Sequence, residues 1–239
     1  MDFAGAWDAV VSSPLFGITL TLGAFWLAQT LARLAKGRAW ANPVLVAMIL
    51  VAVALALLGV SYEQYMVGGQ FIGFLLGPAT VSLGLPLYRQ ASKVVASAPM
   101  VLVSVTVGSV VGVLSGYWVT RLLGGTHPMA LSMAPKSTTT PISLALSEQI
   151  GGIPALSAIF TIVAGVVGAV LAPWLLNVLR IKDARARGIA IGVSSHGVGT
   201  ARALEESETA GAFSGLALGL TGLITSLVIG ITLALTGAA

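Results

Sequence analysis

The sequence predicts an all-α polytopic membrane protein with about eight hydrophobic segments. Hydrophobic residues make up 56% of its 239 residues and charged residues only 8%, whereas soluble domains carry about 25% charged residues. A core of this size cannot bury so much apolar surface, so lipid is the expected solvent for most of it. The apolar runs are long and continuous, without the period-2 alternation of barrel strands, and therefore indicate helices.

Composition also excludes several classes of protein. Cysteine is absent, which excludes disulfides, thiolate metal sites and cysteine nucleophiles. The pI near 9.8 is typical of nucleic-acid binders, but the twelve Lys and Arg are spread among short loops, where they determine topology. We therefore expect lipid and no nucleic acid as a partner. The acidic start, MDFAGAWDAV, predicts no cleavable signal peptide.

We expect a single membrane domain over residues 1–239. Its segments are predicted at 15–35, 43–60, 71–88, 99–123, 134–150, 153–179, 186–204 and 211–235. Three of them are not ordinary apolar spans. The fifth and seventh hold polar stretches, and the third is interrupted by Gly77, Pro78, Gly84 and Pro86.

The two halves of the chain, 11–123 and 127–236, resemble each other. Gly77 and Gly84 are spaced like Gly192 and Gly199. Each half also ends in a GxxxGxxxG row, which lets helix backbones approach closely. These packing rows are Gly108, Gly112 and Gly116 in one half and Gly211, Gly215 and Gly219 in the other. The halves are therefore predicted to be repeats.

Charge indicates how the repeats are related. The basic loop after the first segment is expected in the cytoplasm, with the N-terminus outside. The loop with Arg180, Lys182, Arg185 and Arg187 lies on the same side if the third segment enters and leaves from one face. Only Arg89 and Lys93 are then misplaced. We therefore predict two inverted repeats, each with three crossings and one re-entrant element, a pattern typical of secondary transporters.

The first polar stretch, APKSTTTP, predicts an anion site. Lys136 precedes four hydroxyl residues, Ser137, Thr138, Thr139 and Thr140, between Pro135 and Pro141. Proline opens a helix well, and a helix N-terminus binds anions. The alternative is a lysine near the lipid headgroups with hydroxyls that cap the helix.

The second polar stretch is GVSSHGVGTARALEE, and it offers further substrate contacts. Its candidates are Ser194, Ser195, His196, Thr200 and Arg202, with Gly192, Gly197 and Gly199 allowing an unwound backbone. Ionisable residues inside a membrane are functional by default. Arg202 is expected to pair with a carboxylate substrate or, as the alternative, with Glu205 or Glu206. His196 is expected to contact a substrate hydroxyl or carry a coupling proton, unless it is purely structural.

Enzyme and metal motifs are missing from the sequence. It has no nucleophile elbow, GxGxxG, HExxH or Walker A motif. We therefore expect no enzyme, no metal and no cofactor apart from a coupling proton or cation.

Three stretches resemble the LrgB/CidB family of bacterial membrane proteins. They are PKSTTTPISLALSEQIGGIPALSA, IGVSSHGVGTARALEES and GAFSGLALGLTGLITSL. The carboxyl half of the plant plastidic glycolate/glycerate translocator is similar too. The resemblance implies either an antiholin-like or holin-like regulator of murein hydrolase export and lysis, or a carrier of glycolate, glycerate or pyruvate. It also implies a small LrgA/CidA-like membrane partner.

We favour a secondary carrier of small 2-hydroxy or 2-oxo monocarboxylates in the bacterial cytoplasmic (inner) membrane. A holin-like pore does not need paired broken segments with a lysine and an arginine at depth, whereas a carrier does. The anion is predicted to bind between residues 134–141 and 192–202, with the third segment as the symmetry-related wall. A homodimer packed through the glycine rows is expected. The lysis regulator and an uncoupled channel stay open as alternatives.

Overall fold

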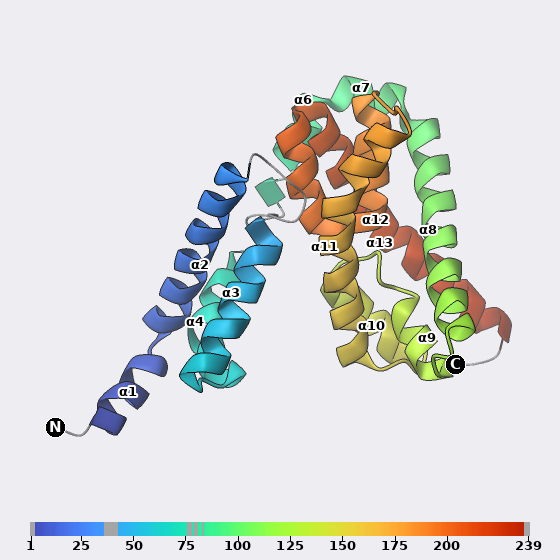
Figure 1. Cartoon of the computed structure of the whole chain (residues 1–239). Helices are drawn as coiled ribbons and strands as arrows, with labels where there is room; N and C mark the ends of the chain where they lie inside the picture. The colour runs from blue at the N-terminus through green and yellow to red at the C-terminus, as the bar shows by residue number, and fades with distance from the viewer. Residues whose placement is uncertain (1–2, 36–42, 76–77, 79–80, 83, 237–239) are drawn as a thin grey trace. The chain divides into compact units, whose positions relative to one another are not determined.

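The computed structural model describes residues 3–35, 43–75, 78, 81–82 and 84–236. All regular structure within these ranges is α-helical (Figure 1), which confirms the predicted fold class. Four of the described helices are long and apolar enough to cross a membrane: Pro14–Leu34, Ala98–Leu122, Pro154–Val178 and Glu208–Thr232. The chain is a multi-pass membrane protein. It divides into two compact units, Met1–Ser82 and Leu83–Ala239.

The first unit consists of α1 (Phe3–Val11), α2 (Pro14–Leu34), α3 (Pro43–Leu58) and α4 (Tyr62–Phe74). Helix α2 packs against both α3 and α4. Its approach to α4 needs glycine, because a Cβ added at Gly17 would lie 3.0 Å from Gly68 Cα. The Thr21 and Tyr65 hydroxyls are 2.8 Å apart across the same contact. Helix α3 is apolar all round and has no buried residue, as expected for a helix surrounded by lipid.

The predicted third segment, 71–88, is broken, as expected. Helix α4 ends at Phe74, and the next described helix, α6, covers Gly84–Arg89. Gly77 lies outside the described residues. The boundary between the two units falls within this segment, so its re-entry and the inverted symmetry of the halves stay predictions.

The second unit is built from long helices and two helical hairpins. Its helices are α6, α7 (Ala91–Ala96), α8 (Ala98–Leu122), α9 (His127–Met133), α10 (Thr140–Gln149), α11 (Pro154–Val178), α12 (Ala184–Glu206) and α13 (Glu208–Thr236). Helix α12 packs mainly against α13 and α11.

Helices α9 and α10 form the first hairpin, hairpin A (127–149). The Ile153 N–H donates to Ser132 Oγ at 2.7 Å, so the residues on either side of the predicted fifth segment touch each other. The prediction that 134–150 crosses the membrane is therefore wrong. Helix α10, with 10 residues, is about 15 Å long, too short for a hydrocarbon core of about 30 Å.

Helix α12 forms the second hairpin, hairpin B (184–206). Its backbone breaks at His196, with φ 40° and ψ −138°, a conformation that costs energy for a residue with a Cβ. Arg187 Nε lies 2.7 Å from Glu206 Oε2 although 19 residues separate them. In one continuous helix they would be about 28 Å apart. The seventh segment thus enters and leaves from one face, as the prediction of a re-entrant element requires. With two hairpins, however, the second half has two crossing helices, α11 and α13, and not the predicted three.

The hairpins enter from opposite ends of α8. The base of hairpin B lies at its start, where Arg185 Nη1 donates to Ser97 Oγ at 3.4 Å. The base of hairpin A lies near its end, where Tyr117 Oη is 3.0 Å from His127 Nδ1. Hairpin A therefore projects toward hairpin B from the opposite face.

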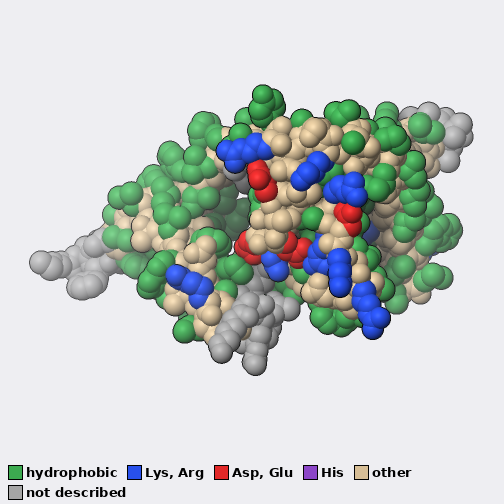
Figure 2. Space-filling model, turned by 90° about the horizontal axis from the view of Figure 1, so that it is seen from above, with side chains coloured by type: hydrophobic (Ala, Val, Ile, Leu, Met, Phe, Trp, Pro, Cys, Tyr) green, Lys and Arg blue, Asp and Glu red, His purple; other side chains and the backbone are tan. Residues whose placement is uncertain are grey.

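One face of the second unit carries most of its charge, and Figure 2 shows blue and red side chains gathered there. Arg89 pairs with Glu208 at 3.6 Å, and Lys93 donates to Thr209 at 3.5 Å, both beside the base of hairpin B. The prediction that Arg89 and Lys93 are misplaced is therefore wrong. Helix α8 crosses away from the charged face, hairpin A does not cross, and α11 crosses back. Residues 89–93 before α8 and 180–187 after α11 therefore lie on the same face. The concentration of basic residues indicates that this face is cytoplasmic.

The base of hairpin B is held by ionic contacts. Asp183 caps α12 by accepting from the N–H groups of Arg185 and Ala186. The hydrogen-bonded Arg185 side chain lowers the pKa of Asp183 to about 2, so the cap stays ionised. Arg187 contacts Glu206 with two nitrogens and also donates to Asn177 Oδ1 at 2.9 Å. These contacts join both ends of hairpin B to the end of α11.

Cysteine labelling tests this arrangement, because the chain has no cysteine of its own. Exposed single-cysteine variants Lys93→Cys, Lys182→Cys and Glu205→Cys should all react with an impermeant maleimide from the same side of the membrane. Glu148→Cys, at the base of hairpin A, should react only from the other side. Labelling of positions 93 and 182 from opposite sides would rule out the hairpin fold.

Candidate functional site

The tips of the two hairpins meet halfway along α8. We define tip A as residues 134–140 and tip B as residues 193–200. A Cβ added at Gly112 would lie 3.4 Å from Ser137 Oγ of tip A, and one added at Gly108 would lie 2.8 Å from Val193 Cγ1 of tip B. Gly108 and Gly112 are one helical turn apart, so about 6 Å of α8 separates the two contacts. The predicted convergence of the two polar stretches is thus a feature of the structure.

Thr161 of α11 connects the two hairpins. Its hydroxyl donates to Ser143 Oγ of α10 at 2.7 Å, and its carbonyl oxygen lies 2.7 Å from His196 Nε2. Because a carbonyl can only accept, Nε2 carries the proton and donates. His196 is only 7% exposed, so the imidazole is a buried polar group whose one described partner is Thr161.

Small residues on α11 make room for tip B. The ring of His196 lies where a Cβ of Gly165 would be, and the side chain of Ser195 lies where a Cβ of Gly168 would be. Sequence reasoning missed Thr161, Gly165 and Gly168. The available signal was a row of small or polar residues at helical spacing in an otherwise apolar span: Ser157, Thr161, Gly165 and Ala169.

Lys136 carries a positive charge into the protein interior. Its ammonium group donates to the Gly112 carbonyl at 2.8 Å and lies against Gly116. Among the described residues, no carboxylate forms an ion pair with Lys136. An uncompensated charge inside a membrane protein favours an anionic ligand.

The other predicted residues of tip A shape the start of α10. Thr139 is the N-cap residue and Pro141 lies in the first turn. Thr138 is fully buried and donates to the Pro135 carbonyl at 2.8 Å. The helix begins at Thr140, so its positive N-terminal end lies at the meeting point of the hairpins.

Tip B is tied to α13 as well as to α11. The fully buried Thr200 hydroxyl donates to the His196 carbonyl at 3.0 Å and lies 2.9 Å from Ser214 Oγ. Ser194 bonds mainly within α12, with Ala190 O at 2.8 Å. Close packing of Gly199 against Ser195 and Ile191 holds the two halves of hairpin B together.

Arg202 lies toward the base of hairpin B and not at its tip. Its guanidinium contacts Glu205 at 3.2 Å and Glu206 at 4.0 Å. The structure therefore shows the helical ion pair that the sequence offered as the alternative to a substrate contact. Arg202 extends the network around Arg187 and Glu206.

The glycine rows pack in different ways. Gly108, Gly112 and Gly116 of α8 accommodate the hairpin tips and Lys136. Gly211 lies against Leu204, whereas a Cβ added at Gly219 would have no described neighbour within 4 Å. Packing between subunits through these rows stays a prediction.

The described residues of the site offer a positive charge and several hydrogen-bonding groups. Among the described residues, no group of three or more His, Cys, Asp and Glu side chains could hold a metal ion. Lysine, hydroxyls, a buried imidazole and helix ends instead converge between the two hairpins.

Opposed re-entrant hairpins between crossing helices define a multi-pass membrane protein with a polar centre. Residues 21–235 match the LrgB-like family, so this chain belongs to that family, as its motifs predicted. No solved structure matches the chain.

Several relatives are similar over most of their length. An uncharacterised protein, YxaC, of Bacillus subtilis is 40% identical over 77% of this chain and 80% of its own. An uncharacterised protein of Haemophilus influenzae is 36% identical over 87% of this chain and 90% of its own. A Bacillus mycoides relative named antiholin-like protein LrgB is 34% identical over 92% of this chain and 96% of its own.

Packing of His196 against α11 can be tested at Gly165. Gly165→Ala should destabilise the protein by about 1–3 kcal/mol, because the added methyl group overlaps the buried imidazole. Unfolding of the purified protein by heat or denaturant measures the effect. Gly230→Ala is the control, since a Cβ there would have no described neighbour within 4 Å. Equal stability of the two variants would contradict the described position of His196.

Proposed function

We propose that the chain is a secondary carrier of small 2-hydroxy or 2-oxo monocarboxylates. The observation that carries the proposal is an ammonium group without a described carboxylate partner where two broken helices meet. The N-terminal ends of α10 and of the second half of α12 lie at this point. Both ends carry partial positive charge. A carboxylate would bind Lys136 and these free N–H groups.

The dimensions and donors favour a small polar anion. About 6 Å of α8 separates the contacts of the two tips, a length that matches an acid of few carbon atoms. The Ser137 hydroxyl, beside Gly112, would donate to a 2-hydroxy or 2-oxo oxygen, and Nδ1 of His196 would contact a 2-hydroxy group. Glycolate, glycerate and pyruvate have this chemistry, and the family resemblance points to the same acids.

Alternating access follows from the opposite entry of the hairpins. Hairpin B closes the centre toward the charged face, and hairpin A closes it toward the other face. The bonds of Arg187 to Glu206 and Asn177 would hold hairpin B shut while hairpin A moves. We place this carrier in the bacterial cytoplasmic membrane, as a homodimer.

The second candidate is a regulator of murein hydrolase export and lysis. The names of the Bacillus relatives, antiholin-like protein LrgB, favour it over the carrier. In that role the chain would act with a small LrgA/CidA-like membrane protein. The polar centre would then serve the folding of the hairpins and not the passage of an anion.

Uptake by proteoliposomes tests the proposal. The purified wild type should accumulate labelled glycolate or pyruvate saturably. Lys136→Gln should reduce uptake at least about tenfold, since a charged hydrogen bond is lost. Lys182→Gln removes an exposed loop charge instead and should leave uptake unchanged.

The two candidates give different results in this assay. A leak that ignores substrate identity and the Lys136→Gln substitution, with or without an LrgA-type partner, would contradict the carrier. Restoration of lysis control by Lys136→Gln in cells that lack the gene would then support the regulator.

A further inference from the structure

Among the described residues, four buried hydroxyls lack a hydrogen-bond partner. One is Ser147 of α10, and the other three lie on α8 and α13. The three on α8 and α13 are Ser109, Thr221 and Thr225. Other helical hydroxyls on these helices bond to the carbonyl four residues earlier, as Thr120 and Ser226 do. The unpartnered three thus turn away from their own backbone, although that bond is open to them. Buried polar groups without a partner are rare and indicate a ligand.

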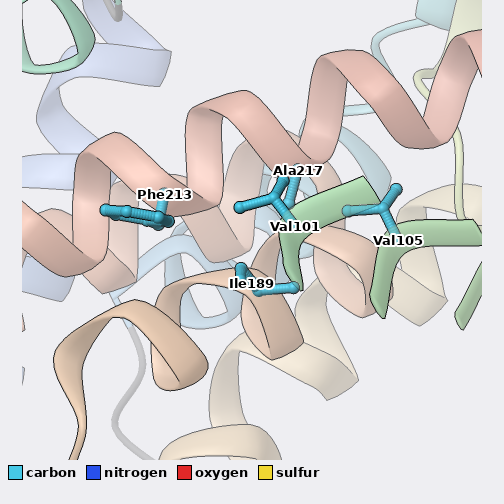
Figure 3. Close-up of a cluster of buried hydrophobic side chains, with 5 residues drawn as sticks. All are labelled: Val101, Val105, Ile189, Phe213 and Ala217. Carbon is cyan, nitrogen blue, oxygen red and sulfur yellow. The ribbon is translucent and has the colours of Figure 1, made fainter. Parts of the chain in front are cut away.

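A shared apolar cluster fixes the level of these three hydroxyls along α8 and α13. Figure 3 shows Val101 and Val105 of α8, Ile189 of α12, and Phe213 and Ala217 of α13. Both α8 and α13 start at the charged face, so they run in the same direction through this cluster. The next turn beyond Val105 carries Ser109, and the next turn beyond Ala217 carries Thr221, with Thr225 one turn further.

The first half of α12 ends at the same level. It runs parallel to α13, because Gly188 lies against Ala210 and Gly192 against Ser214. Val193, close to its end, packs on Gly108, the neighbour of Ser109. The helix breaks at His196, so the C-terminal end of its first half lies near the level of Gly108. A helix C-terminus carries partial negative charge.

Tip A packs against α8 and α13 just beyond the three hydroxyls, on the side away from the charged face. Ile142 of α10 packs on Gly222, which follows Thr221, and Ser137 packs on Gly112, one turn beyond Ser109. The three hydroxyls therefore lie within the protein between the end of the first half of α12 and tip A.

We propose that Ser109, Thr221, Thr225 and the terminal carbonyl oxygens of the first half of α12 bind a monovalent alkali cation. Hard cations take oxygen ligands such as hydroxyls and carbonyls. A helix C-terminus attracts a cation and repels a carboxylate, so the acid and the cation occupy different ends of the polar centre. Serine and threonine hydroxyls do not titrate, which excludes a proton as the ligand of these groups.

A coupling role for the cation rests on the proposed carrier function, whereas cation binding does not. Lys136 and the cation would repel each other in the empty centre. A bound carboxylate would neutralise Lys136 and so favour cation binding, and linkage makes the effect reciprocal.

Thermal unfolding of the purified full chain in detergent tests the site without any substrate. The five tryptophans report unfolding in sodium, potassium or N-methylglucamine chloride at equal ionic strength. Sodium or potassium should raise the unfolding temperature saturably over N-methylglucamine, by on the order of 3 °C at ten times Kd. Equal unfolding temperatures in all three salts would overturn the proposal.

Single substitutions at the proposed ligands test where the cation binds. Thr221→Val and Ser109→Ala should each abolish the salt-specific shift. Ser226→Ala, on the same helix with its hydroxyl bonded to Gly222 O at 2.8 Å, should keep it. A shift that survives both Thr221→Val and Ser109→Ala would place the cation elsewhere and overturn the site. If sodium or potassium raises the unfolding temperature but no carboxylate is taken up, the carrier function is rejected and the cation site is retained. If carboxylate is taken up but neither salt raises the unfolding temperature, the cation site is rejected and the carrier function is retained.

Discussion

The hydrogen bonds of Thr161 join the elements on which the rest of the structure depends. A helix that breaks inside a bilayer must bury its freed backbone groups in protein or expose them to a watery cavity. Both hairpins satisfy this constraint by ending beside Thr161, one through Ser143 and the other through His196. The small residues Gly165 and Gly168 let tip B approach α11 closely enough. That contact helps to compensate the strained backbone at His196.

Because the hairpins enter from opposite faces, the ion pairs lie at the base of hairpin B and the polar residues of the site lie at the hairpin tips. Ionic contacts gather at the base of hairpin B on one face, where they fix topology and clasp the hairpin. The centre instead holds one ammonium group, hydroxyls and the ends of four half-helices. Helix N-termini and C-termini meet there, so the same small volume offers sites for an anion and for a cation. A lysis regulator has no evident need for such a centre, whereas a carrier does.

Much of the fold could be predicted from hydropathy, because long apolar runs define α2, α8, α11 and α13 to within a few residues. The polar stretches also identified both tips. Hydropathy could not distinguish a crossing from a hairpin at 134–150, since both bury apolar residues; the bond between Ser132 and Ile153 decides it. Thr161 and Gly165 were missed because their role depends on packing against a distant segment. Arg202 was predicted to bind substrate because of its charge, but it forms ion pairs with the neighbouring Glu205 and Glu206.

Disulfide trapping on adjacent turns of α8 tests most directly whether the two tips meet. A Cβ at Gly108 would lie 3.7 Å from Val193 Cβ, and one at Gly112 would lie 4.0 Å from Ser137 Cβ, both close to the mean of about 3.8 Å in disulfides. The pairs Gly108→Cys with Val193→Cys and Gly112→Cys with Ser137→Cys should each oxidise to a cross-link in membranes. Proteolysis between the paired positions should then leave the fragments joined until reduction. Fragments that separate without reductant in either pair, with the protein folded, would contradict the meeting of the hairpins.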